Sequence, residues 1–263
     1  MRAYLAILSS RIRTLLQYRA AAIAGVATQL FFGIVRMMIF DAFYRSSASA
    51  VPMSHEQTIT YIWLGQGMIL LALFGVDKDI AEMIRSGSVA YELTRPLDLY
   101  SLWFARALSG RATPLVMRAI PILSVALLFL GLQPPPTIAN ALAFLVAAVG
   151  ALLLASAIIV LLTVLLLWTI SGEGINRLVP ALIFFCSGIA VPLPLFPEWL
   201  QSAIAILPFR ALMDTPFRLY MGHLSGAAAL SALVHQWTWI IVAVLAGRMI
   251  LARGLRRLVV QGG

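Results

Sequence analysis

The feature that most constrains this chain is its set of long apolar runs. Most of its six runs have roughly 18 to 30 residues and one is longer, so each is long enough to cross about 30 Å of bilayer hydrocarbon as a helix. Only 11 % of the 263 residues are charged and the mean hydropathy is +0.96, whereas about a quarter of a soluble domain is charged. The chain is therefore expected to be an all-α polytopic membrane protein, a single transmembrane domain over residues 1–263. Its six transmembrane helices are predicted over about 20–44, 58–76, 112–132, 137–170, 178–196 and 228–252.

The distribution of basic residues predicts the orientation of the chain. Nineteen Lys and Arg against ten Asp and Glu give a net charge of +9. Fourteen of the basic residues fall on one side of the predicted spans and three on the other. Cytoplasmic loops carry such an excess, so both termini are expected in the cytoplasm, and an even number of spans agrees with this. Because these residues lie beside the spans, they do not indicate binding to nucleic acid.

Residues 1–18 have the pattern of an amphipathic helix. Apolar residues recur there at three- and four-residue steps, with Arg and polar residues elsewhere on the wheel; the apolar positions are Leu5, Leu8, Ile12 and Leu15. A helix of this kind lies in the membrane interface. The alternative is an extension of the first span into the cytoplasm, where basic residues are also common. We expect an N-terminal interfacial helix.

Residues 192–227 form a proline-rich segment that is predicted to lie on the outer side. Prolines at this density cannot continue a single helix. Only about ten residues, EWLQSAIAIL, separate Pro197 from Pro208, and they are too few to cross a bilayer. A re-entrant or interfacial outer helix is therefore expected between the two prolines.

The residue types needed for several kinds of chemistry are missing or scattered. Lys78, within VDKD, is the only lysine, so the chain has no P-loop lysine and is not expected to be an ATPase or another enzyme. Cys186 is the only cysteine, and the three histidines are far apart in the sequence, so no metal or cofactor site is predicted. A self-contained secondary carrier needs acidic groups at mid-membrane. The main candidate in this chain is Asp41, which lies near the outer end of the first span.

The segment over residues 77–98 is the part of the largest predicted cytoplasmic loop that begins with a helix signature. In DKDIAEMIRSG, Asp77 is suited to cap the helix, Arg85 lies in its last turn and Gly87 ends it. Ile80, with Met83 and Ile84, gives this helix a small apolar face with a charged rim, which suits docking into a groove of a partner. The alternative is a helix that rests on the lipid surface.

Two stretches resemble the ABC type-2 exporter permeases, the integral membrane subunits of ATP-binding cassette transporters. Residues 80–100, IAEMIRSGSVAYELTRPLDLY, are similar to the second cytoplasmic segment of that family. Residues 184–220, FFCSGIAVPLPLFPEWLQSAIAILPFRALMDTPFRLY, resemble its span end, proline-rich bend, short outer helix and Pro-Phe exit. Gln-Tyr-Arg at 17–19 after a basic helix is similar to a bacterial group of uncharacterised permeases within it.

The resemblance implies a half-transporter in a bacterial cytoplasmic (inner) membrane. A second permease, a different related chain or another copy of this one, would complete the pathway, lined mainly by the first, second and fifth spans. Two separate nucleotide-binding ATPase subunits would bind ATP and Mg, and their closure would drive alternating access and export. The helix over Asp77–Ser86 would be the coupling helix, and the residues implied in contact with the ATPase are Asp79, Ile80, Glu82, Met83 and Arg85.

Two predicted spans contain charged residues, which usually face protein or water inside a membrane. Arg36 lies in the first span and could line a path for anionic headgroups, or it could be the intra- or inter-subunit partner of a carboxylate such as Asp41. Arg118 lies in the third span and is expected to be structural, with its side chain extended towards the cytoplasm alongside Arg111. The alternatives to an exporter permease are a self-contained carrier or channel and a structural membrane scaffold. The sequence does not identify the substrate.

Overall fold

The computed structural model describes residues 13–14, 19–46, 51–72, 75–94, 96–169 and 173–256. Every regular element in these ranges is helical, which confirms the predicted all-α class. The helices are α2 (Arg19–Ser46), α3 (His55–Met68), η1 (Ile69–Leu71), α4 (Lys78–Arg85), α5 (Val89–Leu93), α6 (Leu99–Phe129), α7 (Ile138–Val164), η2 (Leu165–Leu167), α8 (Glu173–Cys186), η3 (Leu193–Leu195), α9 (Glu198–Ile206), η4 (Pro208–Leu212), α10 (Asp214–Tyr220) and α11 (Gly226–Leu255). The predicted interfacial helix over 1–18 lies outside the described residues except for 13–14.

Within the described residues, four helices are long and apolar enough to cross a membrane. They are α2, α6, α7 continued by η2, and α11, with 27 to 31 residues each. This supports a multi-pass membrane protein. The other two predicted spans correspond to α3 and α8, which have 14 residues each, so the count of six spans stays a prediction.

Two predicted boundaries were wrong. The fifth apolar run was expected to be helical over 178–196, but α8 ends at Cys186 and the chain turns at Gly188, where φ is +89°. The third span was expected to begin at 112, but α6 begins at Leu99, where Asp98 accepts a hydrogen bond from the Ser101 amide as the N-cap. Arg106 and Arg111, in the first half of α6, lower the hydropathy of its beginning, and hydropathy indicates burial in lipid and not helix length.

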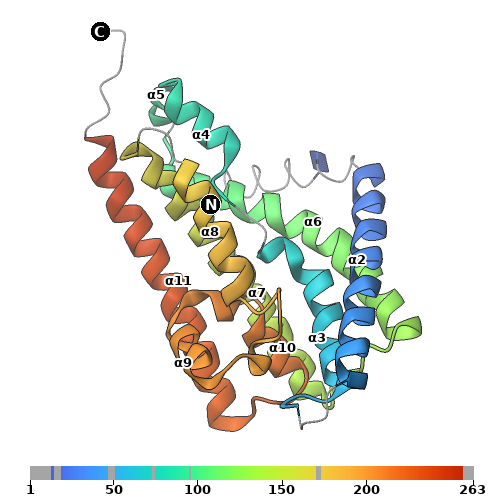
Figure 1. Cartoon of the computed structure of the whole chain (residues 1–263). Coiled ribbons are helices and arrows are strands. Elements are labelled where there is room, and N and C mark those ends of the chain that lie inside the picture. Colours follow the sequence, from blue (N-terminus) through green and yellow to red (C-terminus); the bar gives the residue numbers. More distant parts are fainter. Residues whose placement is uncertain are drawn as a thin grey trace.

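Helix α7 lies at the centre of the bundle and packs against α6, α10 and α11 (Figure 1). Helix α2 lies at one edge, where it packs against α3 and α6, and α11 lies at the opposite edge. Helices α4 and α5 lie at one end of the bundle, called here the α4 end, and α9 and α10 lie towards the other, called the α9 end (Figure 1). The largest fully buried side chains are Trp63, Trp103, Tyr61 and Phe217.

Both short helices predicted outside the spans are present. Asp77 accepts hydrogen bonds from the amides of Asp79 and Ile80 at the start of α4, and the chain leaves this helix through Gly87 at a φ of +72°. Helix α9 forms between Pro197 and Pro208 as expected, and its re-entrant or interfacial position stays a prediction. Sequence reasoning missed α10, which packs on α7.

Candidate functional site

Arg36 joins α2 to the turn that follows α8. Its Nη2 donates hydrogen bonds to the carbonyl oxygens of Ile189 and Ala190, the latter at 2.8 Å. At Gly188, a Cβ atom would overlap the hydroxyl of Tyr61, and the positive φ also favours glycine there. Gly188 thus favours this turn, and Arg36 connects α2 to the turn after α8.

Asp41 is not the partner of Arg36. Its carboxylate pairs with Arg45 at 2.7 Å, one helical turn further along α2, and with Nε2 of His55 at 3.3 Å. All three side chains are more than a third exposed, so these pairs contribute little to stability. Within the chain, the predicted pair between Arg36 and Asp41 was therefore wrong, because a sequence does not suggest backbone carbonyls of a distant turn as partners. A carboxylate partner in another subunit stays a prediction.

Arg118 lies on α6 and faces α2. Its guanidinium fills the space that a side chain at Gly25 would need, and its Nε is buried without a hydrogen bond. Arg111 does not accompany it, because Nη1 of Arg111 donates to the carbonyl of Leu70 at the end of η1, at 3.0 Å. The glycine on α2 thus allows the close approach of a charged side chain within the bundle.

Two glutamines that the sequence analysis did not single out lie at the same junction of α2, α3 and α6. Gln66 of α3 packs on Gly33 of α2 beside Trp63 and is 1 % exposed. Gln29 lies on α2 one turn from Gly33. The Oε1 atoms of both glutamines are buried and accept no hydrogen bond. A glutamine inside an apolar run was the signal that could have identified them.

The predicted coupling residues are divided between two faces of α4. Ile80 is 1 % exposed, and Met83 is partly buried against the hydrophobic core. Asp79, Glu82 and Arg85 are exposed. The apolar face of α4 is therefore turned to its own chain, against η2 and α5, and the charged face is turned outward.

The beginning of α4 is hydrogen-bonded to α7 and α8. The amide of Asp77 donates to Oγ1 of Thr163 on α7 at 3.0 Å, and the amide of Val76 donates to Oδ1 of Asn176 on α8 at 3.2 Å. Through these two hydrogen bonds, a displacement of α4 would act directly on α7 and α8.

Helix α5 is fixed to α6 by a buried ion pair. Glu92 is 6 % exposed, and its carboxylate accepts hydrogen bonds from Nη1 and Nη2 of Arg106 and from Nε1 of Trp103, at 3.2, 2.6 and 2.9 Å. Burial of a charge at this depth requires such partners. The α4–α5 segment is thus anchored to α6, α7 and α8 through specific polar contacts.

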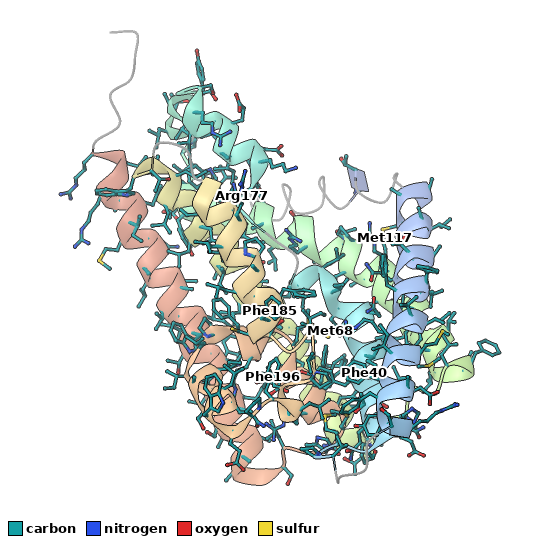
Figure 2. The ribbon with its side chains drawn as sticks, viewed as in Figure 1. Phe40, Met68, Met117, Arg177, Phe185 and Phe196 are labelled. Atoms are coloured by element: carbon teal, nitrogen blue, oxygen red, sulfur yellow. The ribbon has the colours of Figure 1, made fainter. Side chains whose placement is uncertain are left out.

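A cavity of about 790 Å³ lies beneath α4. Its wall includes Asp77, Arg106, Gly110, Arg111 and Asn176, drawn from the α4 segment, α6 and α8. In the view of Figure 2, Arg177 lies at the α4 end of α8, whereas Phe185 lies further along the same helix and Phe40 lies on α2. Within the described ranges, no group of three or more His, Cys, Asp or Glu could hold a metal ion.

Comparison with known proteins identifies a family. Residues 30–262 match the family model described as "ABC-2 family transporter protein". A search of curated proteins found no match.

Proposed function

The chain belongs to the ABC-2 family of transporter proteins, and on that premise we propose that it is the permease subunit of an ATP-driven exporter, forming half of a translocation pathway. As a member of this family it is a membrane transport component and not itself the catalytic subunit. Its proposed partners are two ATPase subunits, which bind ATP and Mg, and a second permease. The proposed location is a bacterial inner membrane with both termini in the cytoplasm.

The observation that carries this proposal is the attachment of α4. Its outward face presents the charged residues Asp79, Glu82 and Arg85, and its beginning is hydrogen-bonded to α7 and α8. Helix α5, which follows it, is fixed to α6 by Glu92. A helix that only rests on lipid does not need these attachments, whereas they connect α4 to the bundle as a coupling helix requires. We therefore assign the contact with the ATPase to the charged face, with Ile80 and Met83 supporting the helix from within.

The proposed mechanism is alternating access. Closure of the ATPase pair moves α4, and Thr163 and Asn176 carry this movement to α7 and α8. The turn after α8 is held by Arg36 of α2 at its carbonyl groups, so a shift of α8 also moves α2. The first, second and fifth predicted spans correspond to α2, α3 and α8, and the proposed pathway runs along them. The chain supplies the path and the coupling, and the partner supplies the hydrolysis.

The test is to tag the chain in its native membrane, extract it gently and identify the co-purifying subunits and their stoichiometry by mass spectrometry. An ATPase with a second, different permease would support a heteromeric exporter, and an ATPase alone would support a pair of identical permeases. Intact, monodisperse protein without an ATPase would refute the proposal and favour the alternative, a self-contained carrier or channel.

A further inference from the structure

Four polar side chains form a stripe on the bundle side of α2. The stripe, called here the α2 polar stripe, consists of Arg118, Gln29, Gln66 and Arg36. The stripe follows the face of α2 that carries Gly25, Gln29, Gly33 and Arg36. These positions are spaced by four, four and three residues, so they lie one above another. At a rise of 1.5 Å per residue, the face extends over about 16 Å, roughly half of a hydrocarbon core.

Three polar side-chain atoms of the stripe have no hydrogen-bond partner in the described part of the chain. Oε1 of Gln66, Oε1 of Gln29 and Nε of Arg118 are buried and have no hydrogen-bond partner. Gln66 is almost completely enclosed, at 1 % exposure. Most buried polar atoms in proteins do have partners, so these orphaned atoms indicate a polar ligand. The two Oε1 atoms are acceptors and the Nε–H group is a donor, so the ligand must carry a hydrogen-bond donor as well as an acceptor.

The charge of the stripe selects the sign of that ligand. It contains two arginines and no acidic residue. The nearest acid along α2, Asp41, is already paired with Arg45 and His55. Arg36 is satisfied by carbonyl groups, which are dipoles and leave its positive charge uncompensated. An anionic group is therefore favoured at the arginines, because guanidinium groups suit the oxygens of a phosphate, sulfate or carboxylate. The orphaned amide oxygens require a donor, such as a hydroxyl group, on the same headgroup.

The other side of α2 indicates where this anionic group comes from. That side carries the exposed apolar residues Ile23, Phe31, Ile34, Val35 and Met38, and the exposed residues Phe32 and Ile39, three or four positions from Arg36, border the stripe. In a membrane these side chains lie against acyl chains. Because α2 is at the edge of the bundle and Arg118, Gln29 and Arg36 are only partly buried, a molecule could hold its headgroup on the stripe and its tail in the bilayer.

We propose that the α2 polar stripe binds the anionic headgroup of a membrane-embedded amphiphile, whose apolar tail stays in lipid beside α2. This inference rests on the proposed permease function and names the class of its substrate. Arg118 receives the headgroup at the half of α2 nearer the α4 end. Oε1 of Gln29, which is only partly buried, accepts a hydrogen bond from a donor group of the headgroup along the way. Arg36 lies at the far limit of the stripe, beside the turn after α8.

The experiment uses the full chain in nanodiscs of phosphatidylcholine, with no ATPase present. A small fraction of phosphatidylglycerol carries a photoreactive diazirine close to its headgroup, and a matched phosphatidylcholine probe serves for comparison. After irradiation, adducts are mapped by mass spectrometry. The anionic probe is expected to label α2 and α6 around the stripe more strongly than the zwitterionic probe. Excess glycerol 3-phosphate in the buffer is expected to leave this labelling unchanged.

Variants connect the labelling to the stripe. Loss of one charge-assisted contact in Arg118→Gln is expected to lower labelling by the anionic probe by about tenfold. Gln29→Leu is expected to lower it less while helical content and elution volume stay normal, and it serves if Arg118→Gln fails to fold. Arg253→Gln removes an exposed charge from α11, outside the stripe, and is the matched control.

Equal labelling by the two lipids, or labelling unchanged in both stripe variants, would overturn the proposal. Full competition by glycerol 3-phosphate would overturn its lipid part, because the site would then bind a soluble anion. The result is independent of the ATPase: a chain that binds no ATPase refutes the proposed exporter, whereas a chain with an ATPase and no lipid preference refutes only the stripe.

Discussion

Glu92 and Arg106 form a bidentate ion pair across the joint between α5 and α6, with oxygen–nitrogen distances of 2.6 and 3.2 Å. Trp103 donates a third hydrogen bond to the same carboxylate. The side chain of Arg106 is 18 % exposed and that of Glu92 only 6 %. This pair fixes α5 to α6.

Removing one partner of this pair is expected to be costly. Arg106→Met removes the bidentate partner of the buried Glu92 carboxylate, and removing one partner of a buried ion pair typically costs about 3–5 kcal/mol of stability. The double variant Glu92→Gln with Arg106→Met removes both charges and is expected to recover part of this loss. Thermal unfolding in detergent, followed by circular dichroism, measures both. A single variant as stable as the double would contradict the role given to the pair.

Loss of Arg36 is expected to loosen the turn after α8. Arg36→Met leaves the carbonyl groups of Ile189 and Ala190 without their donor and removes the bridge to α2. The native Cys186 is a reporter at the end of α8, and it is partly buried. Its alkylation by a maleimide is expected to be faster in Arg36→Met than in the parent chain. Arg45→Met, which removes an exposed charge from the same helix, is the control and should leave the rate unchanged.

The parts of this fold that local sequence determines were predictable. Apolar runs located the long helices, and Asp77 and Gly87 located α4, because caps act over a few residues. The unpredictable parts depend on long-range contacts. The carbonyl partners of Arg36 lie more than 150 residues away, and the burial of Ile80 depends on where η2 and α5 pack. An amphipathic pattern identifies the apolar face of a helix, but does not say whether that face meets its own chain, lipid or a partner.

Two glycines should respond in opposite ways to the same substitution. Gly33 on α2 is in close contact with Trp63 and Gln66, so Gly33→Leu would push α2 away from α3. Overpacking of this kind typically costs about 1–3 kcal/mol. Gly110 on α6 has open space before it and lines the cavity beneath α4. Gly110→Leu also gains helix propensity of up to about 1 kcal/mol, so its melting temperature should be unchanged or higher. A lower value for Gly110→Leu than for Gly33→Leu would show that the packing of α2 has been misassigned.

Substitutions on the two faces of α4 should have different effects, on stability for the inner face and on ATPase docking for the outer face. Ile80→Ala creates a cavity beneath the helix and is expected to cost about 2–5 kcal/mol of stability, since Ile80 is 1 % exposed. Glu82→Lys changes a charge on the outward face, and substitutions there usually alter stability by less than about 0.5 kcal/mol. If the charged face meets the ATPase, Glu82→Lys should reduce the amount of ATPase recovered with the tagged chain while the melting temperature stays that of the parent. Exposed Glu198, at the start of α9, provides a matched charge reversal, Glu198→Lys, which should alter neither quantity. If ATPase recovery follows the melting temperature in all three variants, the outward face of α4 has no separate role in docking, and the coupling surface must lie elsewhere on the chain.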